Sequence, residues 1–337
     1  MATILVTGVA GFIGSALAQR LLKRGDTVYG IDNLNDYYAV ELKKARLARL
    51  TSSAQFHFQL LDITDRVAMH ALFEQHQFDV VVNLAAQAGV RYSIDHPEFY
   101  FDTNLTGFGH ILEGCRQTHV KHLVFASSSS VYGANVKQPF SESDSVDHPI
   151  SLYAATKKAN ELMAHSYAHL YDLACTGLRF FTVYGPWMRP DMALFKFANL
   201  MTEGKAIPVY NHGEMVRDFT YIDDIIDGVE HVIDKPAQKD TDWNPLQPTP
   251  SSSQAPYRIY NIGCSRAVSL MYYIELLEKH LGIKAKLDLQ PLQAGDVLKT
   301  FADTRLLQQD FDYSAITSVE YGVAQFAAWY KSFYPQS

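Results

Sequence analysis

Short runs of Val, Ile and Leu alternate with longer segments of helical period from residue 3 to about residue 180. Runs this short and apolar are typical of strands buried on both faces, and the amphipathic segments between them are typical of crossover helices. The expected strands are residues 4–7, 27–31, 54–59, 79–84, 122–127 and 174–180. The alternation predicts βαβ units and hence an α/β fold with a doubly wound parallel sheet.

The alternation ends after residue 180, where short helical stretches mix with brief strands. The expected helices are residues 192–204, 223–234, 268–281, 303–309 and 318–331. We therefore predict a first domain over residues 1–180 and a smaller mixed α/β lobe over residues 181–337. Some elements of the two are expected to interleave. Residues 236–256 are rich in Pro, Ser and Gln and read as an exposed loop.

Composition narrows the class of protein. The 337 residues are 47% hydrophobic and 19% charged, with a net charge of -7, and no dense block of Lys or Arg occurs. Nucleic acid and membrane surfaces are therefore not expected partners. The first residues read as a strand, and no apolar run reaches the roughly 20 residues of a membrane span, so we expect a cytoplasmic protein. Three widely spaced cysteines predict neither a disulfide framework nor a metal site.

A glycine-rich turn follows the first expected strand and opens the helix over residues 12–24. Gly8 permits the tight turn, Gly11 allows a pyrophosphate to approach the backbone, and Gly14 lets the helix pack on the strand. The helix N-terminus then faces the anion. This arrangement predicts a dinucleotide site.

Asp32 ends the second expected strand, where a carboxylate can accept hydrogen bonds from a ribose diol and repel a 2′-phosphate. This position favours NAD over NADP. The alternative is that Asp32 only stabilises the turn over residues 32–35.

Tyr153 and Lys157 are four residues apart in a helical segment and so share one face. The ammonium group of Lys157, with the positive nicotinamide ring, can lower the pKa of the phenol so that Tyr153 serves as a general base. Alone, such a pair also occurs by chance on amphipathic helices. A serine-rich run over residues 127–130 leaves a strand upstream, and its hydroxyl groups, those of Ser127 and Ser129 above all, could simply satisfy backbone groups in a loop.

The Gly-x-x-Gly-x-x-Gly turn with Tyr-x-x-x-Lys resembles the extended short-chain dehydrogenase superfamily, and the chain resembles its NAD-dependent epimerase/dehydratase family over nearly its whole length. The resemblance implies a Rossmann-type sheet and a tightly bound NAD that is regenerated in each cycle. The residues implied in cofactor binding are Gly8, Gly11, Phe12, Ile13, Gly14, Asp32, Asn33, Asp62, Ile63, Leu84, Ala85, Ala86, Tyr153 and Lys157. Those implied in catalysis are Ser128, Tyr153 and Lys157.

The serine-rich run also bears on the type of reaction. In related dehydratases the two residues after the catalytic hydroxyl resemble Asp-Glu, and in UDP-glucuronate decarboxylases the second is Glu, whereas here they are Ser129 and Ser130. Without these carboxylates the site can oxidise C4 of a sugar and reduce it again, which is 4-epimerisation.

Residues 179–192 resemble the substrate loop of UDP-glucuronate 4-epimerases. The resemblance implies that Thr182 and Arg189 bind the sugar carboxylate and that Arg217 binds the diphosphate. Ser128 and Ser129 are the further substrate-binding residues expected near the sugar, and Asp296 is expected at the ribose. Each of these residues also has a purely structural alternative. Arg189 could be an ordinary surface arginine, Arg217 could form an ion pair with Asp218 or Asp223, and Asp296 could be a turn residue.

Three other functions stay open at this point. A 4-epimerase of UDP-glucose or UDP-N-acetylglucosamine would share the catalytic residues, a decarboxylase would make a UDP-pentose, and a regulator could bind NAD without catalysis. Family members often form homodimers through two helices, here residues 100–117 and 152–170, so a homodimer is expected.

Overall fold

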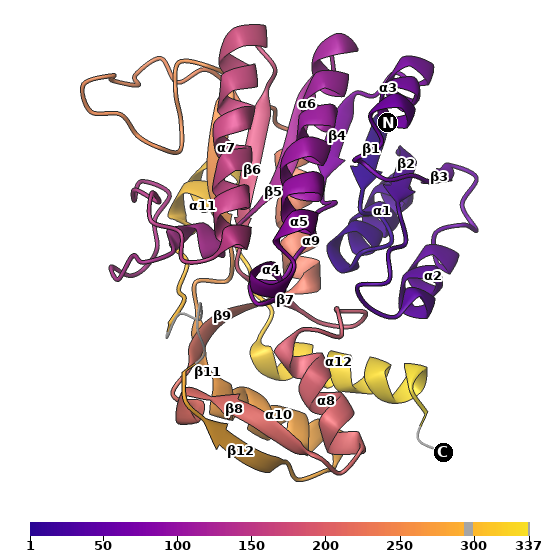
Figure 1. Ribbon diagram of the computed structural model, residues 1–337, viewed down its shortest axis with the longest axis vertical. Coiled ribbons are helices and arrows are strands. Elements are labelled where there is room, and N and C mark those ends of the chain that lie inside the picture. Colours follow the sequence, from indigo (N-terminus) through magenta and orange to yellow (C-terminus); the bar gives the residue numbers. More distant parts are fainter. Residues whose placement is uncertain (293–298, 336–337) are drawn as a thin grey trace.

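A parallel sheet forms the centre of the larger lobe of this computed structural model, which describes residues 1–292 and 299–335 (Figure 1). Within those residues seven strands make this sheet, in the order β10-β6-β5-β4-β1-β2-β3. The strands are β1 (Thr3–Thr7), β2 (Thr27–Asp32), β3 (Phe56–Leu60), β4 (Val80–Asn83), β5 (His122–Ser128), β6 (Cys175–Phe180) and β10 (Tyr257–Ile262). All neighbouring pairs are parallel, as the alternating pattern predicts.

Both faces of the sheet are buried, which explains the continuous apolar runs. In β1, Ile4 and Val6 pack into one hydrophobic cluster and Leu5 packs into another. The helices on the first face are α1 (Phe12–Arg24), α2 (Val40–Ala48), α9 (Ile222–Ile233) and α11 (Arg305–Phe311). Those on the second face are α3 (Arg66–Gln75), α6 (Phe108–Gln117) and α7 (Leu152–Tyr171), seen in front of the sheet in Figure 1. The predicted doubly wound fold is thus confirmed.

Helix α1 ends where the sequence predicts. Gly25 has a left-handed backbone with φ of 98°, and its N–H group donates to the carbonyls of Leu21 and Leu22. This conformation is accessible to glycine at little cost, so Gly25 acts as the C-terminal cap.

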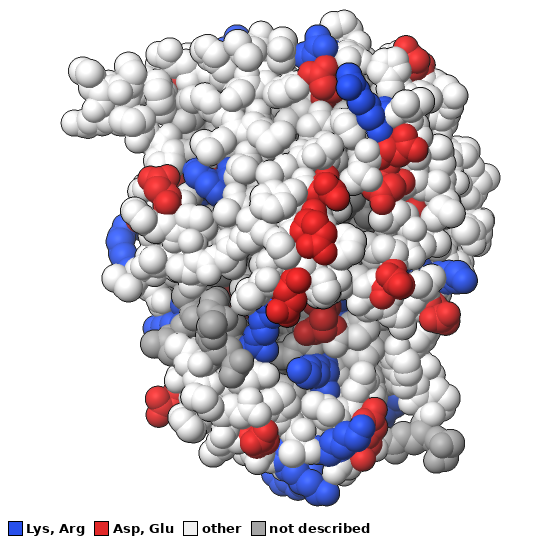
Figure 2. Space-filling view, in the orientation of Figure 1, with Lys and Arg blue, Asp and Glu red and all other residues white. Residues whose placement is uncertain are grey.

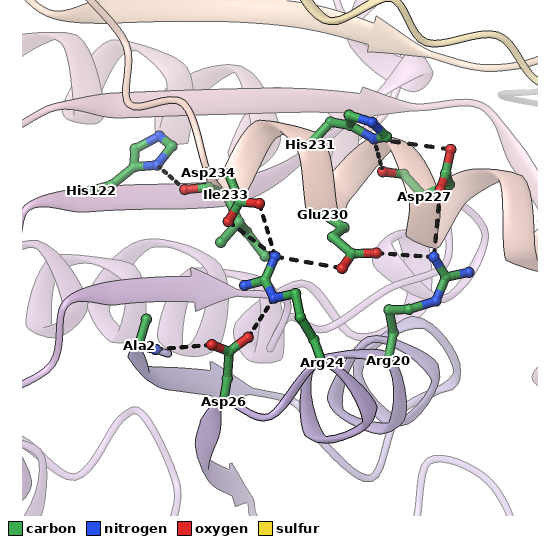
Figure 3. A network of polar contacts seen from close by, with 10 residues as sticks. All are labelled: Ala2, Arg20, Arg24, Asp26, His122, Asp227, Glu230, His231, Ile233 and Asp234. Atoms are coloured by element: carbon green, nitrogen blue, oxygen red, sulfur yellow. Dashed lines mark hydrogen bonds and ion pairs between the residues drawn. The ribbon is translucent and has the colours of Figure 1, made fainter.

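Ion pairs tie α1 to α9 across the first face of the sheet (Figure 3). Arg24 Nη1 lies 3.0 Å from Asp234 Oδ2. Arg20 Nη1 lies 2.9 Å from Glu230 and 3.4 Å from Asp227. Helix α9 comes after residue 180 in the chain. These ion pairs therefore join α1, in the first predicted domain, to a helix of the second.

The smaller lobe lies below the sheet in Figure 1. Its helices are α8 (Ala193–Thr202), α10 (Leu270–Leu281) and α12 (Val319–Phe333). Its strands are β7 (Thr182–Tyr184), β8 (Ala206–Tyr210), β9 (Val216–Tyr221), β11 (Ala267–Ser269) and β12 (Lys286–Gln290). Strand β10 lies in the large sheet beside β6, so the chain returns to the first lobe after entering the second. The division at residue 180 stays a prediction.

Boundaries differ from the expected ones where turn chemistry intervenes. The third strand begins at Phe56 and not at residue 54, because Phe56 N–H closes a turn onto the Ser53 carbonyl. Helix α11 begins at Arg305 and not at residue 303, because the Asp303 carboxylate accepts from the Arg305 N–H group.

Acidic and basic side chains intermingle on the face shown in Figure 2. Among the described residues, the helices are all too short or too polar to span a bilayer.

Candidate active site

The glycine turn between β1 and α1 is held by its own backbone. Gly8 has φ of +67°, and the Gly11 N–H group donates to the Gly8 carbonyl at 2.9 Å. A Cβ atom at Gly14 would lie 2.3 Å from the Gly8 oxygen, so only glycine lets the helix begin this close to the turn. The N-terminus of α1 therefore opens at the carboxyl end of β1, where an anion can bind.

The Asp32 carboxylate holds two backbone segments. Its Oδ1 accepts from the Leu34 N–H group at 2.9 Å, and its Oδ2 accepts from the Ala10 N–H group at 3.0 Å. It thus stabilises its own turn and braces the glycine turn. Burial raises the pKa of Asp32, although these N–H groups and Lys43 oppose the rise. Each carboxylate oxygen keeps a second lone pair that a ribose hydroxyl group could use.

The neighbouring positions are joined in the same way. Asn33 Nδ2 donates to Asp62 Oδ2 at 2.7 Å, and the Thr64 N–H group donates to Asp62 Oδ1 at 2.8 Å. These hydrogen bonds hold the pKa of Asp62 below its ordinary value against the opposing effect of burial. The Asp62 carboxylate therefore stays ionised. Asn33 and Asp62 both line the cavity described next.

One cavity joins the predicted cofactor and catalytic residues. Its lining includes Gly8, Gly11, Phe12, Ile13, Gly14, Asp32, Asn33, Asp62, Ile63, Leu84, Ala85, Ala86, Ser128, Tyr153, Lys157 and Arg189. The glycine turn, the carboxylate at the end of β2 and the apolar segment after β4 together fit a dinucleotide that runs across the ends of the strands.

Helix α7 brings Tyr153 and Lys157 into this cavity. It begins at an N-cap, Ser151, whose hydroxyl group accepts from the Ala154 N–H group at 3.2 Å. Lys157 Nζ donates to the Ala126 carbonyl on β5 at 2.9 Å, and burial lowers the pKa of Lys157 to about 8. The lysine is thus anchored to the strand that carries the serine-rich run.

The phenol of Tyr153 is surrounded by groups that act on its pKa in opposite directions. Burial raises the pKa, while hydrogen bonding with Ser128 and the positive charge of Arg189 lower it. The negative charge of Asp191 raises it. Burial outweighs the hydroxyl group and the cation that favour ionisation, so the pKa of Tyr153 lies above its ordinary value.

Ser128 ends β5, and a 3-10 turn (Ser129–Tyr132) follows it. Its hydroxyl oxygen accepts from the Ser130 N–H group at 3.1 Å, so the side chain caps this turn. Ser129 instead lines a second cavity, next to the first, together with Thr182 and Arg217.

Arg189 and Thr182, predicted to bind one carboxylate together, line different parts of this region. Arg189 enters the first cavity and Thr182 the second. Arg189 Nη2 donates to Asp191 Oδ2 at 3.1 Å, while its Nε is buried without a hydrogen-bond partner among the described residues. The same Asp191 oxygen lies 3.4 Å from the Tyr37 hydroxyl group, and burial with this anion raises the pKa of Tyr37 to about 12.

Arg217 lies on β9, and its Nη1 donates to the Val216 carbonyl at 3.0 Å. The adjacent Asp218 is buried and accepts from the N–H groups of Cys264, Ser265 and Ala302 at 3.0, 3.0 and 3.2 Å. Asp218 thus fixes the strand and the loops around it. The predicted ribose contact, Asp296, lies outside the described residues.

Sequence reasoning missed Arg46, which bridges the cofactor and substrate sides of the site. It is completely buried on α2 and donates to the Ala10 carbonyl at 3.0 Å and to the carbonyls of Trp187 and Met188 at 2.6 and 3.2 Å. In the sequence it is one of several Lys and Arg residues of an amphipathic helix, so nothing distinguishes it from a solvated charge.

Comparison with known proteins agrees with this geometry. A Staphylococcus aureus protein named CapI is 52% identical over 331 residues, which cover 98% of this chain and 99% of that protein. A "Probable UDP-glucuronate 4-epimerase" of Rhizobium meliloti is 46% identical over 331 residues, covering 98% and 97%. The crystal structure of UDP-glucuronic acid 4-epimerase from Bacillus cereus in complex with UDP-glucuronic acid and NAD superimposes with a TM-score of 0.86 at 31% identity, covering 98% of this chain and 100% of that one.

Residues 4–263 match the family described as "NAD dependent epimerase/dehydratase family". The match includes the glycine turn, the serine-rich run and the Tyr153/Lys157 helix. The chain therefore belongs to the NAD dependent epimerase/dehydratase family.

Proposed function

We propose that this protein catalyses the reversible, NAD-dependent 4-epimerisation of UDP-glucuronate to UDP-galacturonate through a 4-keto sugar. The observation that carries the proposal is one cavity lined by the glycine turn, Asp32, Ser128, Tyr153, Lys157 and Arg189. The names of the relatives from Rhizobium meliloti and Bacillus cereus support the same activity.

The residues that fit NAD are those of the glycine turn, Asp32, and the segment after β4. When bound, NAD supplies the oxidation of C4 and its later reduction from the opposite face. Gly8 and Gly14 keep the turn tight at the N-terminus of α1, where the pyrophosphate would bind, and Asp32 offers its carboxylate to the adenosine ribose.

Proton transfer falls to Tyr153. Its phenolate takes the proton of the sugar 4-hydroxyl group as C4 is oxidised, and its phenol returns a proton to the oxygen once the ring has turned. Ser128 can donate a hydrogen bond to the same sugar oxygen. Lys157, held by the Ala126 carbonyl, keeps a positive charge near this step. Both half-reactions use the same residues, so holding the sugar in place supplies much of the rate.

The residues that line the two cavities disfavour elimination and decarboxylation. Among the described lining residues, the carboxylates are Asp32 and Asp62, and neither lies beside the serine-rich run. Ser129 and Ser130 stand where a dehydratase or decarboxylase would carry an acid. A site without a second acid or base is suited to removing and returning hydrogen at one carbon.

Arg189 supports glucuronate as the sugar. The buried Nε without a partner among the described residues is a donor that a sugar carboxylate can satisfy. We assign Thr182 and Ser129 to the sugar and Arg217 to the diphosphate, because they line the adjoining cavity.

The test is to incubate purified protein with UDP-glucuronate without added cofactor and to resolve the products by chromatography or proton NMR. UDP-galacturonate as the only product supports the activity, the substrate and retained NAD together. UDP-pentose would show a decarboxylase, and conversion of UDP-glucose or UDP-N-acetylglucosamine alone would show a neutral-sugar epimerase. No turnover of any of these, with NAD added, would favour a regulator.

We propose a homodimer formed through α7 and the segment over residues 100–117, which includes α6. Leu162 and Leu170 on α7 are 58% and 66% exposed, and Phe101 at the start of the π-helical segment Phe101–Gly107 is 50% exposed. Light scattering of wild-type protein and of Leu162→Glu tests this pairing, with a monomeric wild type as the contradicting result. The cytoplasmic location stays a prediction of the sequence, and cell fractionation would check it.

A further inference from the structure

Three consecutive residues at the end of β5 meet three successive turns of α7. The Ala126 carbonyl accepts from Lys157 Nζ at 2.9 Å. The Ser127 hydroxyl group donates to Glu161 Oε1 at 2.7 Å, and Ser128 lines the same cavity as Tyr153 and lowers the pKa of its phenol. Tyr153, Lys157 and Glu161 follow one another at intervals of four residues, so one face of the helix makes all three contacts.

The middle contact is the most firmly anchored. Glu161 and Arg179 are 1% and 0% exposed, and they pair through two hydrogen bonds, from Nε to Oε1 and from Nη2 to Oε2, both of 2.9 Å. Ser127 stands directly opposite Arg179 in the pairing of β5 with β6. The pKa of Glu161 is lowered by Arg179 although burial opposes this, so the carboxylate stays ionised. A charged acceptor held by a bidentate arginine is a rigid reference point for the Ser127 hydroxyl group.

The anchor extends away from the cavity into further buried contacts. Arg179 Nη1 donates to the Tyr132 hydroxyl oxygen at 3.1 Å, and the Tyr132 hydroxyl group donates to Asn261 Oδ1 on β10 at 2.7 Å. The Glu161 carboxylate is therefore fixed by β5, β6 and β10 together. Neither Glu161 nor Arg179 lines the cavities that hold the predicted substrate and cofactor residues.

We infer that Ser127 and Glu161 are positioning residues for the reaction, which set the register of β5 against α7 so that Ser128 meets the phenol of Tyr153. The inference rests on the proposed function for its kinetic consequence and on the three contacts for its geometry. Lys157 alone cannot set this register, because its long side chain can follow a shift of the helix, whereas a short serine hydroxyl group at 2.7 Å cannot.

The consequence concerns the ionisation of Tyr153. The titratable and charged groups around its phenol are Lys157 on the same helix, Tyr100 on α5 (Pro97–Tyr100), and Arg189 and Asp191 on the loop after β7. The Ser127 hydroxyl group is bonded to Glu161 and to none of these. Ser127 acts through Ser128, the next residue of the strand, whose hydroxyl group favours the phenolate. Losing the register moves this hydroxyl group away from the phenol, so the pKa of Tyr153 rises.

Ser127→Ala is the variant that tests the inference, because it removes one hydroxyl group and leaves the Glu161–Arg179 pair intact. We expect kcat for UDP-glucuronate at pH 7.5 to fall about fivefold, as for the loss of one hydrogen bond, with KM unchanged. The rising limb of kcat against pH should move up by roughly half a pH unit. Ser127→Thr keeps the hydroxyl group and should restore the wild-type limb.

The matched control is Ser252→Ala. Ser252 is also buried and donates to a carboxylate, Asp240 Oδ2, at 2.7 Å, but in the loop over residues 236–256. We expect equal melting temperatures for the two alanine variants and a changed pH profile for Ser127→Ala alone. An unchanged pH limb in Ser127→Ala would overturn the inference, as would a raised KM with unchanged kcat, which would make Ser127 a direct substrate contact.

A measurement without turnover separates this inference from the proposed function. Ultraviolet titration of phenolate, taken as the difference between a protein and its Tyr153→Phe derivative, reports the pKa of Tyr153 directly. A higher pKa in the Ser127→Ala background supports the positioning role even if UDP-glucuronate proves not to be the substrate. Equal pKa values in the two backgrounds would refute it.

Discussion

Arg189, which lines the cavity, forms an ion pair with Asp191, with Nη2 and Oδ2 3.1 Å apart. Their side chains are 27% and 28% exposed, so the pair is partly screened by water. The arginine expected to bind the sugar carboxylate therefore already has one anionic partner, and its buried Nε is left for a second. Both residues act on the pKa of Tyr153, Arg189 lowering it and Asp191 raising it.

We predict that Arg189→Ala raises KM for UDP-glucuronate by about tenfold to a hundredfold, since hydrogen bonds to a charged group are lost. The variant should also release CO2 and UDP-4-keto-pentose. Oxidation of C4 makes a β-keto acid, and an arginine that grips the carboxylate can hold the breaking bond out of line with the carbonyl. Product analysis by NMR with trapping of CO2 measures both effects.

Arg305→Ala is the control for that experiment, because Arg305 is an exposed arginine that pairs with Asp303 outside the two cavities. If Arg189→Ala released neither CO2 nor the keto-pentose, the arginine would have no part in protecting the intermediate. An unchanged KM would remove it from the carboxylate site altogether.

Asp191→Asn should act in the opposite sense. The variant frees Arg189 of a competing carboxylate, so KM for UDP-glucuronate should fall by up to about fivefold, the limit for a partly exposed pair. The negative charge that raises the pKa of Tyr153 is also removed. That pKa then falls, and the rising limb of kcat against pH moves to lower pH.

The inhibition constant of UDP-glucose, which has no carboxylate and competes for the same site, serves as the internal control for Asp191→Asn. A rise in KM for UDP-glucuronate would mean that Asp191 orients Arg189 more than it competes for it. A limb that stayed at the wild-type pH would mean that the Asp191 charge does not reach the phenol.

The sequence could predict those parts of the site that depend on neighbours in the chain. The glycine turn needs only a strand, three glycines and a helix, and Tyr153 and Lys157 need only the spacing of one helical turn. The six strands up to residue 180 also follow from the local pattern, whereas β10, which joins the same sheet beside β6 from the later part of the chain, does not. Helix α1 was predicted from Phe12 to Arg24, and its bounds are confirmed.

Contacts between distant segments could not be predicted in this way. Arg46 and Trp187 are 141 residues apart in the chain, and nothing in either local pattern indicates that a guanidinium group will meet that carbonyl. The bond between Ser127 and Glu161 has the same origin, since it depends on how α7 packs on β5. Such residues look like ordinary surface charges or loop serines until the packing is known.

Glu142 gives a prediction about stability and pH. It is 3% exposed, accepts from the Asn261 N–H group at 2.8 Å, and has its pKa raised by burial from 4.5 to about 7. Between these two pH values the unfolded chain releases a proton that the folded protein keeps, so wild-type stability falls as the pH rises through that window. Glu142→Gln removes this loss and can still accept from Asn261.

We therefore expect Glu142→Gln to exceed the wild type in stability by up to about 3 kcal/mol at pH 8 and to show no such gain at pH 5. Denaturant unfolding at the two pH values measures the difference. Glu275→Gln, at an exposed position of α10, should change little at either pH. If the free energy of unfolding of Glu142→Gln differed from that of the wild type by the same amount at both pH values, the Glu142 carboxyl group would not titrate in that window.

Replacing Arg46 should weaken the binding of both the cofactor and the substrate. Its guanidinium group donates to Ala10 in the glycine turn and to Trp187 and Met188 before Arg189, so one side chain fixes both loops. Arg46→Met keeps much of the apolar stem but leaves these carbonyls without their donor, at a cost of about 2 kcal/mol or more. The loosened glycine turn should hold NAD less tightly, and the loosened loop should bind UDP-glucuronate less tightly.

The measurement is the NAD content per chain after gel filtration, followed by KM for added NAD and for UDP-glucuronate. Arg49→Met is the matched control, because Arg49 lies over the Trp187 ring at 4.7 Å and donates to Gln19, not to either loop's backbone. We expect Arg46→Met to lose NAD and to raise both KM values, with Arg49→Met close to the wild type. If Arg46→Met lost stability but kept its NAD and both KM values, the buried arginine would support the fold without coupling the two loops.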